Sequence, residues 1–370
     1  MSMCLLGQLF FCVVEITSGL DDLAPDDLVL DAAISTALAS DDPVVSIGQG
    51  TLVLSIYPAA LRETDPVRKN RDLQNLRITG SGSGTTIIRG VSELGFDVLQ
   101  LNAVSNLTID SLAIESIKTG TSSTGCNGIS LTNGCRNIVI RDVHVRSLPY
   151  VLLADRFDGG KGVTIQTGLY GVEPTDGIVV DRCRVSDCAV GLGLDVAPVP
   201  GLVPGTVLFT NNTVERSCLA FYSSFAETSV GLGYVPGCDI QYTGNLAFDC
   251  KRTAFVTRTP NLTFQYNSSM TTQYPSIPDP YQDQYPDMQI VVAGGVGCTV
   301  SYNSLTCSLP QNAFIAIGSA NAATVGCSFL ENTLSGPANY GFDRLPGVMF
   351  RTHIRDNAIE GCAVDVDPRL

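Results

Sequence analysis

The sequence predicts an all-β solenoid, a parallel β-helix of about ten or eleven coils, from three observations. First, short segments with apolar residues at alternating positions, the pattern of a strand, recur along the chain. Their mean spacing is about 31 residues, and a fixed period of roughly 20–50 residues is typical of stacked units. Second, six of these segments carry Asn at the same position. Third, only 16% of the 370 residues are charged, against about 25% in ordinary domains.

Residues 1–19 form an apolar N-terminal segment. Residues 1–14 carry no charge, but a membrane span takes about 20 residues. A signal peptide is not convincing, because the positively charged start and the A-x-A cleavage site are both missing. We therefore expect this segment to pack on the protein or to face a partner subunit.

A short capping helix is predicted within residues 20–40. Residues 25–27 read Pro-Asp-Asp, and the start of a helix favours both proline and acidic residues. Apolar residues follow at helical spacing. Residues 41–370 form the β-helix itself, with loop insertions near 146–176 and 271–288, where the repeat is interrupted.

The repeat places like residues above one another. Its segments include NLTIDSLAI, NIVIRDVHV, GIVVDRCRV and TVLFTNNTV. Strands of successive coils lie about 4.8 Å apart, so a column of Asn can hydrogen-bond amide to amide, as in cross-β ladders. Asn also tolerates the left-handed backbone of a tight corner. We therefore expect an asparagine ladder at the position that is filled, in chain order, by Leu112, Val143, Cys183, Asn212, Asn245, Asn267, Asn303, Asn332 and Asn357.

Cysteine fills two further columns. The chain has 13 Cys, an odd number, so at least one is unpaired. We interpret the stacked cysteines as buried thiols, because free Cys behaves as a small apolar residue. Disulfides between neighbouring coils are the alternative, since the coil spacing falls within the range that a disulfide allows. The first column is Cys188, Cys218, Cys250, Cys307 and Cys362, and the second is Cys135, Cys238, Cys298 and Cys327.

Charge and hydropathy argue against two kinds of partner. The net charge is −14, and the 22 Lys and Arg residues form no run. A nucleic-acid partner is therefore not expected, because its phosphates need clustered basic residues. Beyond the N-terminal segment, no apolar run is long enough to span a membrane.

From the predicted helix onward, the chain resembles the opening of the pectin-lyase-like right-handed parallel β-helix superfamily. The resemblance rests on the helix and on the stretches VVSIGQGTLVL, NLRITGSGSGTTIIRG and FDVLQLNAVSNLTIDSLAI, and it covers about residues 25–370. It implies a right-handed coil formed by a single chain. It does not imply one chemistry, because the superfamily includes lyases, hydrolases, epimerases, phage tailspikes and non-catalytic structural proteins.

Signature motifs separate these activities. The N-T-D, G-H-G and R-x-K motifs of polygalacturonase-like hydrolases are absent. The D-P-H-E motif of alginate-epimerase-like enzymes is also absent, since Asp42-Pro43 and Asp279-Pro280 lack the following His-Glu. Pectate-lyase-like enzymes use several Asp residues to bind calcium and an Arg as the base, and this looser pattern stays open.

Charged residues concentrate between positions 110 and 184. If they form an acidic-sugar site, Asp110, Asp142 and Asp181 are the candidate ligands of Ca²⁺, the one cofactor that we consider. Arg141 and Arg182 are then the candidate catalytic bases, with Asp181 beside them, for removing the proton next to a uronate carboxyl. The alternative, which we favour, is a ladder of Asp and Arg on neighbouring coils, because opposite charges on adjacent strands attract.

Two interruptions of the repeat are candidates for substrate binding, because long loops beside a rigid coil are where function gathers. The first follows Val143, and the second reads YPSIPDPYQDQYPD from Tyr274 onward. Tyrosine offers a flat amphipathic face to a sugar, while a stiff exposed loop is the equal alternative. The candidate substrate-binding residues are His144, Arg184, Tyr150, Asp155, Asp158, Tyr274, Tyr281 and Tyr285.

Three functions are compatible with these observations. We prefer a non-catalytic surface or virion-type structural protein that can bind glycans, because no hydrolase or epimerase motif is present. The alternatives are a calcium-dependent, pectate-lyase-like polysaccharide-processing enzyme and a tailspike-like depolymerase subunit. The resemblance implies an extracellular or virion-surface location and a polysaccharide as the partner. The last predicted coil exposes strand edges, so we also expect self-association or another assembly partner at the chain ends.

Overall fold

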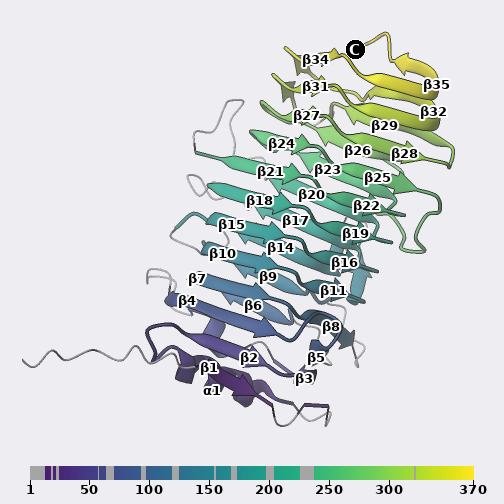
Figure 1. Cartoon of the computed structure of the whole chain (residues 1–370). Coiled ribbons are helices and arrows are strands. Elements are labelled where there is room, and N and C mark those ends of the chain that lie inside the picture. Colours follow the sequence, from purple (N-terminus) through teal and green to yellow (C-terminus); the bar gives the residue numbers. More distant parts are fainter. Residues whose placement is uncertain are drawn as a thin grey trace, which may run out of the picture.

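The computed structural model is one continuous stack of parallel strands, which climbs from the helix at its base to the last strands at its top (Figure 1). It describes residues 13–17, 20–21, 25–56, 58–63, 71–92, 97–118, 125–153, 156–167, 173–196, 204–225, 237–320 and 322–370. The coils contribute strands to three faces, and these strands pair in parallel with their counterparts on neighbouring coils. The predicted parallel β-helix is therefore confirmed.

The first face is a twelve-stranded sheet. Its strands are β1 (Val13–Ile16), β2 (Val44–Ile47), β4 (Arg71–Gly80), β7 (Val104–Asp110), β10 (Arg136–Arg141), β15 (Asp176–Asp181), β18 (Thr206–Thr210), β21 (Asp239–Thr243), β24 (Leu262–Gln265), β27 (Thr299–Ser301), β31 (Ser328–Leu330) and β34 (His353–Arg355). Twelve strands exceed the ten or eleven predicted coils. The reason is that the end of the apolar N-terminal segment forms β1, which pairs with β2.

The other two faces belong to one larger sheet. The second face contains β3 (Gly50–Leu54), β5 (Thr86–Ser92), β8 (Ala113–Lys118), β11 (His144–Arg146), β16 (Arg184–Ser186), β19 (Thr213–Glu215), β22 (Leu246–Phe248), β25 (Ser268–Thr271) and β28 (Ser304–Cys307). The third face contains β6 (Leu99–Asn102), β9 (Ile129–Thr132), β14 (Lys161–Thr167), β17 (Val190–Val196), β20 (Leu219–Phe225), β23 (Arg252–Thr257), β26 (Met288–Ala293) and β29 (Gln311–Ile317). Near the top, β32 (Thr333–Arg344) and β35 (Ala358–Val366) run across both faces.

The remaining elements are short. The helix α1 (Asp27–Ala37) lies at the base and buries Leu30, Ala33 and Ile34 against the first coils. A 3₁₀ turn, η1 (Ala59–Leu61), follows β3. Two small pairs complete the structure. The antiparallel hairpin of β12 (Tyr150–Leu152) and β13 (Phe157–Gly159) leaves the coil, whereas β30 (Thr324–Val325) and β33 (Met349–Phe350) are a short parallel pair between successive coils.

The acidic residues near α1 serve the first coil as well as the helix. The buried Asp26 carboxylate accepts a hydrogen bond of 3.0 Å from the backbone N–H of Val53 in β3. Asp27 accepts from the backbone N–H of Ser55 at 2.7 Å, just after the same strand. These bonds fix α1 over the end of β3, because the two carboxylates satisfy backbone N–H groups at the end of that strand.

The interior is a set of apolar columns. The aligned positions of the repeat pair in register, so Ile109, Ile140, Val180 and Phe209 follow one another on successive coils. All four are fully buried. Since side chains alternate between the two sides of a strand, this register turns the period-two pattern of the sequence into one continuous core.

A ladder of buried asparagines lines one corner of this interior. The Nδ2 of each Asn from Asn212 to Asn332 donates to the Oδ1 of the Asn on the next coil, at 2.9–3.1 Å. The same Nδ2 also donates to a strand carbonyl of the coil below, as Asn267 does to Tyr242 at 2.8 Å. Each side chain is therefore fully engaged, which makes a buried amide acceptable in an apolar core.

The residues with a left-handed backbone lie one position before the ladder residues, whereas the sequence predicts that conformation for the ladder residues themselves. Tyr266 and Tyr302 have φ of 56° and directly precede Asn267 and Asn303. Among the residues before the other ladder positions, Arg182 has φ of 50°. The corner thus turns on an outward-facing residue, and the ladder Asn is selected for its amide and not for its backbone freedom.

The eleven cysteines that the structure describes are free thiols, and all except the half-buried Cys362 are buried. Their columns are less regular than predicted. Cys188 and Cys250 point into the main core, whereas Cys218 belongs to a second apolar cluster outside the coil. The reason is a shift of one position, because Leu219, which follows Cys218, pairs with Val190 and not with Ala189.

The predicted insertion near 146–176 is only partly a loop. Lys161–Thr167 forms β14, a regular strand that pairs with β9 below and β17 above. The excursion that leaves the coil here is the hairpin β12–β13. In the second predicted insertion, the chain leaves the coil after β25 and returns at β26. Among the described residues, no helix has the length and apolarity needed to cross a membrane.

Replacing a ladder residue should destabilise the stack. In an Asn267→Ala variant, the backbone N–H of Asn245 and the carbonyl of Tyr242 lose their partners, and each unsatisfied buried group costs about 1–3 kcal/mol. We expect the free energy of unfolding, measured with urea, to fall by about 3 kcal/mol. The exposed Asn339→Ala is the control and should change it by less than about 0.5 kcal/mol. Equal effects of the two substitutions would contradict the role of the ladder.

Candidate functional site

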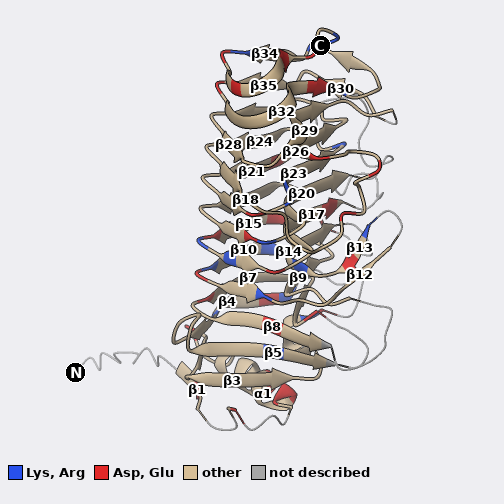
Figure 2. Cartoon of the chain, turned by 90° about the vertical axis from the view of Figure 1, so that its right-hand side faces the viewer, with Lys and Arg blue, Asp and Glu red and all other residues tan. Residues whose placement is uncertain are grey.

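The charged region predicted from the sequence forms inter-coil ion pairs. Figure 2 shows Lys, Arg, Asp and Glu gathering around β7, β10 and β15, while much of the stack is uncharged. Asp110 lies between Arg77 on the coil below and Arg141 on the coil above, with nitrogen–oxygen distances of 2.7 and 3.4 Å. Burial would raise the pKa of Asp110, but hydrogen bonds from Arg77 and Thr79 outweigh it, so the pKa lies below its ordinary value.

Arg182 is held in the same way by two carboxylates. It donates to Asp142 at 2.8 and 2.9 Å and also pairs with Asp181. The hydrogen bond to Asp142, with the charge of Asp181, raises the pKa of Arg182. A catalytic arginine base needs a lowered pKa or strong positioning. Arg182 is paired with Asp142 and Asp181, and the catalytic role that we considered for Arg141, Arg182 and Asp181 stays a prediction.

The three candidate calcium ligands take part in ion pairs. Arg141 lies between Asp110 and Asp181 along the stack, and Asp142 shares Arg182 with Asp181, so the calcium site stays a prediction. A calcium ion needs six to eight oxygen ligands. Within the described residues, no group of three or more His, Cys, Asp or Glu side chains is placed to hold a metal ion.

The other charged candidates lie on the second face. The ring of His144 is 3.1 Å from the Ser186 hydroxyl, and burial, with the charge of Arg184, lowers the pKa of His144. Arg184 pairs with Glu215 at 2.7 Å. Neither residue is among those that line the three hollows described below. Arg184 thus continues the ion pairs between coils, whereas His144 contacts a hydroxyl group.

The two excursions meet over an apolar cluster outside the coil, on the third face. The cluster contains Phe157 of the hairpin, Phe255 of β23 and Tyr285 of the second excursion. Tyr281 stacks on Phe255, with ring centroids 4.5 Å apart. Tyr285 is only 6% exposed, so it anchors its loop and cannot offer a ring face to a sugar, which corrects our expectation for this residue.

A buried ion pair fixes the second excursion to the coil. Arg252 at the start of β23 pairs with Asp279 at 2.6 Å, and the two side chains are 1% and 0% exposed. Arg252 also donates to the carbonyls of Met288, at 3.0 Å, and Tyr285. Since charges are buried only when they are paired and hydrogen-bonded, this pair determines where residues 274–287 lie.

A lateral hollow, which we call the corner pocket, is lined by residues of both excursions. It has a volume of about 440 Å³. Tyr150 of the hairpin and Tyr274 of the second excursion both line it, although 124 positions separate them in the chain. The full lining is Tyr150, Asp187, Arg216, Asp249, Gln273, Tyr274, Pro275, Ser276 and Ile277.

The charged floor of the corner pocket comes from a second corner of the coil. Asp187, Arg216 and Asp249 have φ of 57°, 49° and 49°, so each occupies the left-handed position of its own coil. Arg216 donates to both oxygens of Asp187 at 2.7 Å. Asp249 accepts from the backbone N–H groups of Thr272 and Gln273 at 2.7 and 3.2 Å, which fixes the start of the second excursion.

Sequence reasoning did not identify this floor. Its signal is a spacing of four, because Asp187, Arg216 and Asp249 each follow a ladder position by four residues. The repeated Asn marks only the corner on which the ladder lies. Of the predicted substrate-binding residues, Tyr150 and Tyr274 come together in the corner pocket. Asp158 lies on the hairpin, in β13.

A smaller hollow of about 80 Å³ lies beside the hairpin, and we call it the lysine pocket. Lys161 donates to Asp195 at 2.5 Å and lies 5.8 Å from the ring centre of Tyr222. Burial, with the charge of Asp195, raises the pKa of Tyr222 well above its ordinary value, so its phenol stays protonated. Tyr281 also lines this pocket. The remaining predicted residue, Asp155, lies outside the described residues.

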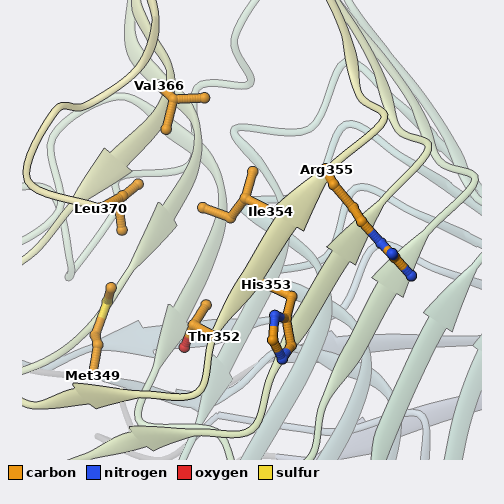
Figure 3. Close-up of a pocket in the computed structure, with 7 residues that line it drawn as sticks. All are labelled: Met349, Thr352, His353, Ile354, Arg355, Val366 and Leu370. Atoms are coloured by element: carbon orange, nitrogen blue, oxygen red, sulfur yellow. The ribbon is translucent and has the colours of Figure 1, made fainter.

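A third hollow, of about 320 Å³, lies at the top of the stack (Figure 3). The side chains around it include Ile354 and Val366 of the uppermost strands, which no further described coil covers. We interpret this hollow as the exposed end of the apolar interior. Its lining residues are Met349, Thr352, His353, Ile354, Arg355, Val366 and Leu370.

Comparisons with known proteins support the fold. No family model matches the chain, and no curated protein matches its sequence. Among solved structures, the A-module of the mannuronan C-5 epimerase AlgE4 of Azotobacter vinelandii is similar, with 13% identity, a TM-score of 0.52, and coverage of 94% of this chain and 96% of that one.

Two further solved structures are similar at the same level. The A-module of AlgE6 from the same organism shares 14% identity, with a TM-score of 0.50, over 95% of this chain and 98% of that one. The GH136 lacto-N-biosidase of Eubacterium ramulus shares 12% identity, with a TM-score of 0.52, over 86% of this chain and 62% of that one. The chain thus has the right-handed parallel β-helix fold that its resemblance to the pectin-lyase-like superfamily implied.

Breaking the buried ion pair should destabilise the protein more than breaking an exposed one. An Arg252→Met variant leaves the buried Asp279 carboxylate without its cationic partner, with the backbone N–H of Tyr281 as a remaining donor, and breaking a buried ion pair in this way costs about 3–5 kcal/mol. The double variant Arg252→Met/Asp279→Leu should recover most of that loss, because an apolar pair can replace a buried ion pair. Unfolding in urea measures both.

The exposed Arg182→Met is the matched control and should cost less than about 1 kcal/mol. If the single and double Arg252 variants lose the same stability, the unpaired charge of Asp279 is not the cause of the loss, and the prediction is wrong.

Proposed function

We propose that this protein binds a polysaccharide without cleaving it, and that the corner pocket is the binding site. One observation carries the proposal: two separate excursions from a rigid coil bring Tyr150 and Tyr274 into the lining of one open hollow, together with the polar side chains of Asp187, Arg216 and Asp249. Ligand sites are typically concave, with apolar and aromatic walls and a few fixed polar groups. The corner pocket has each of these features.

The chemistry of the lining suits a sugar. Tyrosine rings pack against the apolar faces of a sugar ring, and the hydroxyl group of Tyr274 is itself buried, so this residue would contribute its ring. The Asp187–Arg216 pair has fixed polar atoms at the floor, and Lys251 lies 5.6 Å from the ring centre of Tyr274. Because acidic and basic groups are both present, we expect the pocket to bind the hydroxyl groups of a sugar better than a ligand whose charges all have one sign.

The printed names of the similar structures agree with a glycan-related role, since they include mannuronan epimerases and a lacto-N-biosidase. The absence of the D-P-H-E motif separates this chain from alginate-epimerase-like chemistry. An extracellular or virion-surface location fits a polysaccharide ligand, and we include it in the proposal. Self-association remains part of the proposal as well, supported by the exposed apolar side chains at the top of the stack.

Removing either tyrosine ring from the corner pocket should weaken glycan binding. We expect Tyr150→Ala and Tyr274→Ala to reduce affinity at least tenfold, about 1.4 kcal/mol, in native gels cast with polygalacturonate, alginate or a neutral glucan. Circular dichroism would establish that the variants are folded.

Tyr266→Ala is the control, because Tyr266 is 58% exposed and stacks on Tyr302 at the other corner of the coil. Binding site and function are both contradicted if no polysaccharide retards the unaltered protein. The site alone is contradicted if Tyr266→Ala weakens binding as much as the pocket variants.

The lyase alternative makes a different prediction. A polyuronate lyase forms an unsaturated product that absorbs ultraviolet light, and a calcium-dependent one does so only when the ion is present. We expect no such absorbance with or without Ca²⁺, because Arg182 is held by two carboxylates. Absorbance that appears with the unaltered protein and disappears in Arg141→Ala or Arg182→Ala would instead establish the enzyme.

A further inference from the structure

Two cysteines occupy equivalent positions on neighbouring coils near the top of the stack. Cys298 directly precedes β27 and Cys327 directly precedes β31. The next residues of the two strands pair in register, and the backbone N–H of Ser328 donates to the carbonyl of Cys298 at 2.8 Å. Strands paired in this way run about 4.8 Å apart, within the Cα separation of about 4.4–6.8 Å that a disulfide requires.

Their side chains point to the same place. Both residues are buried, with 1% and 0% exposure. A methyl group built on Gly295 would lie 2.6 Å from the Sγ of Cys298 and 3.4 Å from the Sγ of Cys327, so both sulfurs face one point. The thiol of Cys298 lies 3.1 Å from the carbonyl oxygen of Thr259, and that of Cys327 lies 3.7 Å from the carbonyl oxygen of Val325. The thiols of Cys135, Cys188 and Cys250 donate to backbone carbonyls as well. What distinguishes the pair is that its two sulfurs face one point from neighbouring coils.

We propose that Cys298 and Cys327 are a redox site, which closes into an inter-coil disulfide when the chain folds in the presence of a small-molecule disulfide. The thiolate of Cys327 attacks one sulfur of the small disulfide, whose S–S bond breaks and releases one thiolate. The thiolate of Cys298 then attacks the mixed disulfide and releases the second thiolate. Two cysteines are oxidised, one disulfide is reduced, and the two thiol protons pass to the released thiolates.

Both sulfurs are buried in the folded stack, so the exchange takes place while these coils assemble. A thiolate is the attacking species in exchange, and the same disulfide forms whichever of the two cysteines attacks first.

The bond would act near the top of the described stack. In a solenoid each unit contacts only its neighbours, so a bond between two coils stabilises mainly the coils that it joins. Ile354 and Val366 of the uppermost described strands line the hollow of Figure 3. The disulfide would join the two coils directly beneath them, which carry β27 and β31.

The experiment is to refold the full chain with reduced and oxidised glutathione, block the remaining thiols with iodoacetamide, and map the peptides by mass spectrometry. Chymotrypsin is the suitable protease, because no Lys or Arg lies between Arg258 and Arg344. We expect a linked pair of peptides containing Cys298 and Cys327, lighter by about 2 Da than the sum of the two thiol peptides. The midpoint of urea unfolding should fall by roughly 0.5–1 M when dithiothreitol is added.

Two variants make the test specific. Cys327→Ala should abolish both the linked peptides and the effect of dithiothreitol on the midpoint. Cys250→Ala, at a buried cysteine whose thiol bonds a carbonyl, should leave both unchanged. The proposal is overturned if Cys298 and Cys327 are both recovered alkylated from the refolded protein, or if either is linked to another cysteine. The dithiothreitol measurement on the unaltered chain needs no variant to fold.

Discussion

Hydrogen bonding between successive coils holds equivalent residues about 4.8 Å apart, and the rest of the structure depends on that spacing. A side chain must suit the one above and the one below it. Asparagine does so in the ladder, because its amide both donates and accepts along the stack. Aromatic rings do so by stacking, as Phe209 and Tyr242 show with ring centroids 4.5 Å apart and nearly parallel planes.

The same spacing explains the charge pattern. A column of like charges would repel itself, so a charged residue needs an opposite charge on the next coil. Glu115 lies between Arg89 and Arg146, with nitrogen–oxygen distances of 2.6 and 2.9 Å. The concentration of charge between positions 110 and 184 thus includes the ion pairs between neighbouring coils that this spacing requires. Surface pairs of this kind contribute little stability, but they fix which strands lie side by side.

The sequence was sufficient to predict the coil and the ladder, because both depend on short-range periodicity. It placed Tyr150 and Tyr274 among the candidates, but it could not show that Asp187 and Arg216 lie beneath them, since two turns of the coil intervene. The burial of Tyr285 could not be predicted from the sequence either. It depends on the ion pair between Arg252 and Asp279, which joins a strand to an excursion whose path no repeat determines.

The helix at the base and the regular coil spacing also have a consequence for the time course of folding. Contacting coils are separated by about 31 residues of a 370-residue chain, a relative contact order near 0.08, which is in the range of helical proteins and well below that of β-sandwiches. A coil can therefore settle as soon as it leaves the ribosome, on an edge that is already formed. Because α1 precedes the coils that it covers, synthesis and winding proceed in the same direction.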